Sequence, residues 1–275
     1  IIGDSGEVVA KQTSAVVVNQ GEALHHFGMK VVSPRLWEME NPYIYTLNIS
    51  LLQNGEIIHQ YKTNFGFREF LVRDGWFFLN GKRMFFKTIY NREGFHPRGG
   101  FLSNDILYKE LTQIKAMNFD SIRFHNYVPA PEVLDMCDRM GILVIQAHGA
   151  SWGLKESNKY MEEQFRFHLQ NVIENTMNHP SIVAWELQNE CHGPLEGKVA
   201  RESLPFLREL DETRLVFLSS GRWDPAVLST GSISNPGSLN WDCEWGLEGD
   251  VSDEQMEEFY QGLGVWDEED NLMGG

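Results

Sequence analysis

The sequence contains few cysteines and has a deficit of positive charge. Cys137, Cys191 and Cys243 are widely separated and form no CxxC pair, so neither a disulfide framework nor a zinc motif is expected. The 23 Lys and Arg residues are outnumbered by 39 Asp and Glu residues, which gives a formal net charge of −16. Because phosphate binding needs clustered basic residues, no nucleic-acid partner is expected.

Long apolar runs and metal-binding motifs are also missing. No run approaches the roughly 20 apolar residues of a membrane-spanning helix, so no membrane partner is expected. The histidines show neither HExxH nor a paired spacing, so no metal or other cofactor is expected. Residues 1–18 lack the features of a secretory signal. The compartment and the oligomeric state stay open, and a periplasmic or secreted location would require that an upstream signal has been removed.

Residues 1–70 have the pattern of a β domain. Four short runs rich in β-branched and aromatic residues are separated by turn formers, at residues 8–18, 25–32, 43–52 and 56–65. Asn54–Gly55 between the last two runs predicts a tight hairpin, since both residues tolerate positive φ. Four strands are too few for a complete sandwich, so we expect the C-terminal part of one.

In residues 71–275 the predicted strands and helices alternate. A hairpin around Asn80–Gly81 is followed by strands expected at 84–90, 121–125, 142–147, 182–188 and 214–220, and by helices expected at 104–117, 132–140, 160–178 and 200–210. This order indicates a parallel sheet with helical crossovers. Both an open doubly wound sheet and an eight-stranded barrel fit it.

Two observations favour the barrel. No glycine-rich phosphate loop follows the first strand, and polar residues gather after several strand ends, where barrel enzymes place their active sites. The stretch is shorter than the roughly 250 residues of a typical barrel, so we expect a partial (β/α)8 TIM barrel within which the chain stops. The polar residues are Asn91, Arg92, His125, Asn126, His148, Asn189, Glu190, Ser219 and Ser220.

Asn189–Glu190 follow the apolar strand 182–187 at the predicted mouth of the barrel. A carboxylate that leaves an apolar strand is partly desolvated, which raises its pKa toward the range that a general acid requires. The spacing alone leaves an alternative open, in which Glu190 caps the next segment or pairs with a loop cation.

Several segments resemble one known family. HPSIVAWELQNE, residues 179–190, resembles the acid/base segment of glycoside hydrolase family 2, the β-galactosidase, β-glucuronidase and β-mannosidase group. NPYIYTLNISL, FGFREF, FFLNGKRMFFKTIYNREGFHP and NDILYKELTQIKAMNFDSIRFHNYVPAPEVLDMCDRMGILV resemble the same family in the expected order. The resemblance covers residues 35–220. It implies an immunoglobulin-like β-sandwich domain in residues 1–70 and a TIM-barrel catalytic domain in residues 71–275.

The resemblance also implies a retaining exo-β-glycosidase that hydrolyses a β-glycoside by double displacement. Glu190 matches the acid/base position, and Asn189 matches the contact to the sugar 2-hydroxyl. Arg123 and His125 match positions that line the subsite of the terminal sugar, and the neighbouring Asn126 is expected to join them. From the residues alone, Arg123 could equally form an ion pair inside the barrel, and His125 a loop hydrogen bond.

Two further residues are predicted to contact substrate with less support from the family pattern. His148 stands where many members of the family carry an acidic residue. Trp152 is expected to stack on a sugar ring or, equally, to lie in the core.

The second carboxylate of a retaining site is not evident in the sequence. Glu244 precedes Trp245 as the family's nucleophile precedes an aromatic residue, but no apolar strand comes before it. A nucleophile beyond residue 275 is therefore expected, and the 275-residue chain is expected to have little activity by itself. The alternative function is a non-catalytic carbohydrate-binding protein on a degenerate or truncated barrel.

Overall fold

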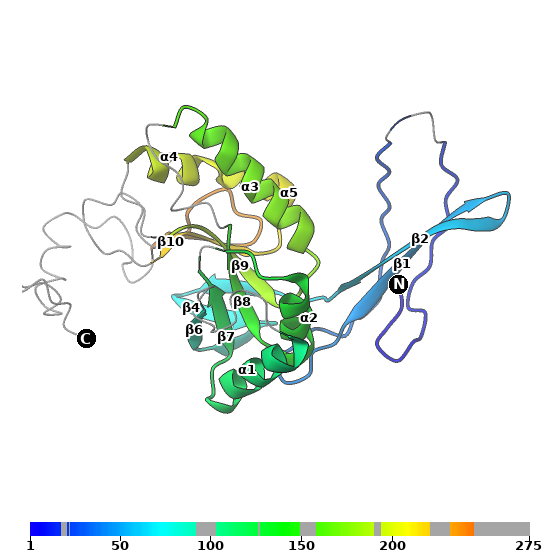
Figure 1. Ribbon diagram of the computed structural model, residues 1–275, viewed down its shortest axis with the longest axis horizontal. Helices are drawn as coiled ribbons and strands as arrows, with labels where there is room; N and C mark the ends of the chain where they lie inside the picture. Colours follow the sequence, from blue (N-terminus) through cyan, green and yellow to red (C-terminus); the bar gives the residue numbers. More distant parts are fainter. Residues whose placement is uncertain are drawn as a thin grey trace, which may run out of the picture.

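The computed structural model describes residues 1–17, 21, 23–91, 103–125, 127–148, 158–189, 194–220 and 232–244. Within these ranges the strands form a two-stranded ribbon, a three-stranded sheet and a seven-stranded sheet. Figure 1 shows the ribbon extending away from the larger sheet and its helices.

The two-stranded ribbon confirms the hairpin predicted at Asn54–Gly55. β1 (Tyr45–Gln53) and β2 (Glu56–Phe65) pair antiparallel around it. Asn54 has φ of 52° and Gly55 has φ of 86°, which is the left-handed conformation that these two residue types adopt at low cost.

The strands expected at 8–18 and 25–32 are not formed in the part of these runs that the structure describes. There the pattern is reduced to an isolated bridge between Ile2 and Val8. Most side chains of these runs are exposed, among them Val17 at 80% and Val32 at 77%. β-branched residues favour a strand mainly by packing on a half-buried sheet, and these runs have no such surface to pack on.

The three-stranded sheet joins the ribbon to the larger sheet. It contains β3 (Phe70–Arg73), β4 (Trp76–Leu79) and β5 (Lys82–Met84), and it confirms the hairpin at Asn80–Gly81. The single strand predicted for 84–90 is wrong, because β5 ends at Met84 and the next strand begins at Thr88 in the larger sheet. The run 84–90 therefore contributes Met84 to the small sheet and Thr88–Tyr90 to the larger sheet. Between them, Phe86 packs on Phe70 and Phe77 of the small sheet, at ring-centroid distances of 5.6 and 5.2 Å.

The seven-stranded sheet contains five parallel strands followed by an antiparallel pair. Strands adjacent in sequence are adjacent in the sheet, without the reversal of strand order that marks a doubly wound fold. The strands are β6 (Thr88–Asn91), β7 (Ser121–Phe124), β8 (Leu143–Ala147), β9 (Ile182–Asn189), β10 (Leu215–Ser220), β11 (Ser232–Ser234) and β12 (Cys243–Glu244).

The described helices are α1 (Asn104–Ala116), α2 (Pro131–Met140), α3 (Met161–Thr176), α4 (Pro194–Glu202) and α5 (Leu204–Leu210). The first three confirm the predicted helices to within two residues at each end. The single helix expected at 200–210 is wrong, because α4 and α5 are separated at Ser203. The Ser203 hydroxyl donates to the Val199 carbonyl at 2.7 Å. Pro205 follows, and a proline cannot continue the backbone ladder of a preceding helix. None of the helices in the described ranges combines the length and the apolar character needed to span a bilayer.

Two hydrophobic clusters show which face of the sheet meets the helices. One cluster packs the helices on outward side chains such as Ile122, Trp185 and Val216. The other packs Trp37 and Phe70 on inward side chains such as Leu143, Ala184 and Leu215, near the strands' amino-terminal ends. The helices therefore cover one face, and the small β3–β5 sheet closes the other face at its amino-terminal end, which is the arrangement of a barrel segment.

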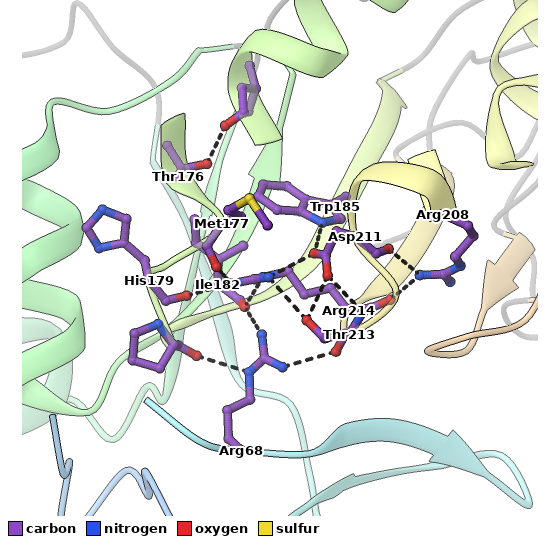
Figure 2. Close-up of polar contacts among 12 residues, drawn as sticks. Arg68, Thr176, Met177, His179, Ile182, Trp185, Arg208, Asp211, Thr213 and Arg214 are labelled. Carbon is purple, nitrogen blue, oxygen red and sulfur yellow. Dashed lines mark hydrogen bonds and ion pairs between the residues drawn. The ribbon is translucent and has the colours of Figure 1, made fainter. Parts of the chain in front are cut away.

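A polar network secures the amino-terminal ends of β9 and β10 (Figure 2). Arg68 donates to the carbonyls of Pro180, Ile182 and Thr213 at 3.2, 2.6 and 3.0 Å. Arg214 also donates to the Ile182 carbonyl, at 2.8 Å, and forms an ion pair of 2.8 Å with Asp211. Arg68, which lies between the β ribbon and the barrel in the sequence, thus shares the Ile182 carbonyl with Arg214.

The Asp211 carboxylate is the anion of this network. Its Oδ2 accepts from Trp185 Nε1 at 2.7 Å, and its Oδ1 accepts from the Thr213 backbone N–H at 2.8 Å. Burial acts to raise the pKa of Asp211, but the Arg214 charge and the donors of Thr213 outweigh it and lower that pKa to about 2. The ionised form therefore stabilises the fold.

We predict that Asp211→Asn lowers the free energy of unfolding at pH 7 by about 3 kcal/mol, because it leaves the Arg214 charge buried without its partner. The contribution of the Asp211 carboxylate to the free energy of unfolding is complete above the pKa of an unfolded aspartate, about 4. It is lost as the pH falls through about 2. In urea titrations between pH 7 and pH 2, the free energies of unfolding of wild type and Asp211→Asn should approach each other as the pH falls. The exposed neighbour variant Glu212→Gln should differ from wild type by less than about 0.5 kcal/mol.

The end of α2 lies directly against the segment before the β ribbon. Gly141 ends the helix with φ of 67°, and a Cβ built there would lie 2.0 Å from the Met39 carbonyl oxygen. Gly55 has a similar φ of 86° but no atom within 4 Å of its Cβ position. The two glycines therefore separate the cost of the backbone conformation from the cost of the contact.

Gly141→Ala should cost about 3 kcal/mol or more, since the strain of a left-handed alanine is joined by a clash with backbone. Gly55→Ala should cost about 1 kcal/mol from the strain alone. Thermal and urea unfolding of the two variants measures the difference. Equal losses would contradict the close packing of α2 on Met39.

Candidate active site

The carboxyl ends of the parallel strands bring polar side chains from β6, β7 and β9 to one edge of the sheet. The register pairs Tyr90 with Arg123 across β6 and β7, and Ala147 with Glu186 across β8 and β9. Alternation along β7 and β9 places Arg123 and Glu186 on the inner face, opposite the helices. Functional groups of barrel enzymes sit at this edge.

Arg123 and Glu186 form a buried, two-pronged ion pair. Arg123 Nε lies 2.9 Å from Glu186 Oε2 and 3.1 Å from Oε1, and Arg123 Nη2 lies 2.9 Å from Oε1. The Glu186 side chain is 0% exposed and that of Arg123 is 15% exposed. Ala147 is the residue opposite Glu186 on β8, and its small side chain leaves room for the guanidinium to reach across that strand. Arrangements of this type are strong and geometrically specific.

The same guanidinium reaches the end of β9. Arg123 Nη2 donates to Asn189 Oδ1, and Asn189 is 1% exposed. Two residues that the sequence predicted as substrate contacts, Arg123 and Asn189, are thus brought together. The ion pair that was the alternative for Arg123 is also present.

Glu186 was not identified as a site residue from the sequence. It lies within the apolar run 182–187 and was assigned to the buried strand with its neighbours. A signal was available, because a charged residue inside an otherwise apolar strand must find a partner when it is buried. The partner, 63 residues earlier in the chain, follows from the fold and not from the local sequence.

Two rings lie beside the ion pair. The Tyr90 and His125 ring centroids are 4.9 Å apart, and the Arg123 guanidinium carbon is 5.9 Å from the Tyr90 ring centroid. His125 is 7% exposed, whereas Tyr90 is 48% exposed. Tyr90 was not predicted as a site residue, because it falls within the strand expected at 84–90. Its half-exposed ring is available to a bound molecule.

His148 follows β8 and packs toward the helices. Its ring lies edge-on to Phe165 of α3 at a centroid distance of 4.5 Å, and it is 4% exposed. Burial lowers the pKa of His148 to about 4, against the opposing effect of hydrogen bonding to the Leu187 backbone. The imidazole is therefore neutral near pH 7, and a substrate contact from His148 stays a prediction.

Gln188 and Ser219 face each other across β9 and β10, one alternation beyond Glu186 toward the carboxyl edge. They are 1% and 5% exposed. Neither the Gln188 amide nor the Ser219 hydroxyl has a hydrogen-bond partner in the part of the chain that the structure describes. Buried polar groups normally have partners, so this pair adds unmet hydrogen-bonding capacity beside Asn189.

Three predicted site residues, Glu190, Asn126 and Trp152, lie outside the described residues. The backbone of Glu244 ends β12, which pairs antiparallel with β11 at the far end of the sheet from β6. Its role as nucleophile stays a prediction.

A second group of acidic and imidazole side chains lies at the opposite edge of the sheet. Asp135, Asp138 and His179 place their ligand-type atoms within 4.8 Å of one another. Asp138 Oδ2 lies 2.6 Å from His179 Nδ1, and its Oδ1 accepts from the Ser181 backbone N–H at 3.0 Å. These bonds hold the loop before β9 against α2, which accounts for the group as a structural one.

Known protein families share this architecture. Residues 70–235 match the family described as "Glycosyl hydrolases family 2, TIM barrel domain", and residues 2–68 match "Glycosyl hydrolases family 2". A beta-glucuronidase from Paenibacillus borealis is 32% identical over 197 residues, which are 67% of this chain and 32% of that protein. A beta-galactosidase from Halalkalibacterium halodurans is 30% identical over 227 residues, which are 77% of this chain and 22% of that protein.

A solved structure shows the same relation. The chain is similar to a glycosyl hydrolase family 2 member from Bacteroides cellulosilyticus, with a TM-score of 0.69 and 25% sequence identity. The similarity covers 78% of this chain and 30% of that one. The chain thus spans a minor part of the length of each of these proteins.

The neutral, buried state of His148 has a measurable consequence. Below the pKa of an unfolded histidine, about 6.5, the unfolded chain takes up a proton that the folded chain does not bind until about pH 4. Stability therefore falls as the pH drops through this window, by about 3 kcal/mol for this residue.

Between pH 7 and pH 4, the His148→Gln variant should lose less stability than wild type by about this amount in urea titrations. The control is His59→Gln, which removes an exposed histidine of β2 and so tests for any effect of losing a histidine as such. Parallel curves for wild type and His148→Gln would contradict the buried neutral imidazole.

Proposed function

The chain belongs to glycoside hydrolase family 2, and we propose that it acts in a retaining exo-β-glycosidase, with Glu190 as the general acid/base. The observation that carries the proposal is the bond from Arg123 to Asn189, which ties the end of β7 to the end of β9. Asn189 immediately precedes Glu190 in the sequence. The carboxyl edge of the sheet thus holds a fixed polar group next to the proposed acid.

The proposed reaction has two steps. In the first, Glu190 protonates the glycosidic oxygen while a carboxylate nucleophile attacks the anomeric carbon and releases the aglycone. In the second, Glu190 takes a proton from water, and that water displaces the carboxylate to release the sugar with its original configuration.

Glu186 does not meet the requirements of the nucleophile. Both of its carboxylate oxygens face Arg123, and its side chain is 0% exposed. A nucleophile must instead lie about 5 Å from the acid/base with one oxygen open to the anomeric carbon. We propose that it comes from a residue outside the part of the chain that the structure describes, with Glu244 the weaker choice because the strand that it ends, β12, has only two residues.

The remaining roles concern binding of the terminal sugar. We propose that Asn189 contacts the 2-hydroxyl and that Arg123 and His125 line the subsite. Asn126 and Trp152 are proposed to extend it, by a hydrogen bond and by stacking on the sugar ring respectively. Tyr90 adds a half-exposed aromatic ring 4.9 Å from His125.

These groups and the names of the relatives support a substrate class for the proposed function. The similar proteins carry the names beta-glucuronidase and beta-galactosidase. We propose a β-linked glycoside with a free 2-hydroxyl as the substrate of the full gene product.

Glu190→Gln should lower kcat/KM by about 10²- to 10⁴-fold for an alkyl β-glycoside, whose leaving group needs a proton. The loss in the glycosylation step should be much smaller with a 2,4-dinitrophenyl glycoside, which leaves without protonation. The assay uses the full gene product with methyl, 4-nitrophenyl and 2,4-dinitrophenyl β-D-galactosides and β-D-glucuronides. Glu202→Gln is the control, because Glu202 is an exposed carboxylate on α4.

Equal losses with all leaving groups would contradict an acid/base role for Glu190. Binding of galactose or glucuronate without hydrolysis of any aryl glycoside would instead support a non-catalytic carbohydrate-binding protein.

A further inference from the structure

We propose that Glu186 is a positioning residue: acting through Arg123, it fixes the orientation of the Asn189 amide and so determines recognition of the sugar 2-hydroxyl. The inference rests on the proposed function, in which Asn189 makes that contact. It assigns a role to a residue that lies too deep to touch the substrate, since the Glu186 side chain is 0% exposed.

The first step is the fixation of the guanidinium. Arg123 meets Glu186 through Nε and Nη2, at distances of 2.9 to 3.1 Å. A guanidinium is planar, so two bonds to one carboxylate define both its position and the direction of its plane. The strand that carries Arg123 is paired on both sides, which fixes the backbone from which its side chain extends.

The second step is the choice between two orientations of an amide. Arg123 carries donors and no acceptor, and its Nη2 donates to Asn189 Oδ1. The reversed amide would set the Asn189 NH2 group against the guanidinium, where two donors would face each other. The Asn189 NH2 group is therefore directed away from Arg123, as a donor for an oxygen such as a sugar hydroxyl.

The third step concerns the need for a carboxylate at residue 186. A glutamine has nearly the same shape, but one of its two terminal atoms is a donor and cannot accept from Arg123. One of the two hydrogen-bonded contacts between Arg123 and residue 186 would be lost, and the guanidinium would turn toward its remaining acceptors. Because Arg123 Nη2 serves both Glu186 and Asn189, a turn of the guanidinium directly alters the bond to Asn189.

The experiment compares two substrates in four proteins. The substrates are the 4-nitrophenyl β-D-galactoside or β-D-glucuronide, whichever the wild-type gene product hydrolyses faster, and its 2-deoxy counterpart. The proteins are wild type, Glu186→Gln, Asn189→Ala and the double variant. Glu202→Gln serves as the surface control, and the melting temperature of each variant verifies that it is folded at the assay temperature.

If Glu186 acts through Asn189, Glu186→Gln should lower kcat/KM for the parent glycoside by about 10- to 100-fold. For the 2-deoxy substrate, which lacks the recognised hydroxyl, the loss should be less than about threefold. The double variant should be no slower than Asn189→Ala, because the two residues form one chain of contacts.

Equal losses on both substrates, or additive losses in the double variant, would overturn the positioning role and leave Glu186 a residue of stability alone. The proposed function is tested separately by Glu190→Gln with the leaving-group series. Full activity of Glu190→Gln would overturn that function even if Glu186→Gln were impaired, and absence of hydrolysis by wild type would overturn both.

Discussion

A guanidinium and a carboxylate buried on the inner face of a sheet must form an ion pair, because neither charge can be buried alone. The pair of Arg123 and Glu186 organises the carboxyl edge of the barrel. Removing either partner would leave a buried charge, at a cost of several kcal/mol. The 2.9 Å contacts therefore fix the position of β7 relative to β9 across the intervening strand β8. The Arg123 guanidinium also bonds Asn189, so the arrangement that stabilises the sheet also places a polar group at its edge.

The opposite edge of the same strands uses buried charges for stability alone. Asp211 and Arg214 pair at 2.8 Å, and Arg68 reaches their neighbourhood from the segment that follows the β ribbon (Figure 2). The backbone carbonyl of Ile182, at the start of β9, accepts from both arginines. β9 is thus anchored at its amino end by one network and carries the candidate site at its other end, a division of roles that barrel enzymes share.

The sequence predicted the elements whose local pattern determines them. The apolar runs at 142–147 and 182–188 became β8 and β9, because a strand covered on both faces needs no polar alternation. The runs at 8–18 and 25–32 also contain β-branched and aromatic residues, yet they form no ladder in their described part, because these runs need a partner strand or a surface to pack on. The contact of Glu186 with Arg123 was beyond local reasoning for the same reason: it depends on the register of three strands. The family resemblance predicted Arg123 and Asn189 as substrate contacts, but it did not point to Glu186, the buried residue that pairs with Arg123.

The central claim is that Glu190, beside an Asn189 fixed by Arg123, serves a double-displacement reaction. The most direct measurement follows the anomeric protons of the released sugar by NMR while the full gene product hydrolyses a 4-nitrophenyl β-glycoside. Two displacements at the anomeric carbon predict that the β anomer appears first and that the α anomer grows in only at the rate of mutarotation. Initial release of the α anomer would show a single displacement by water and would contradict the account.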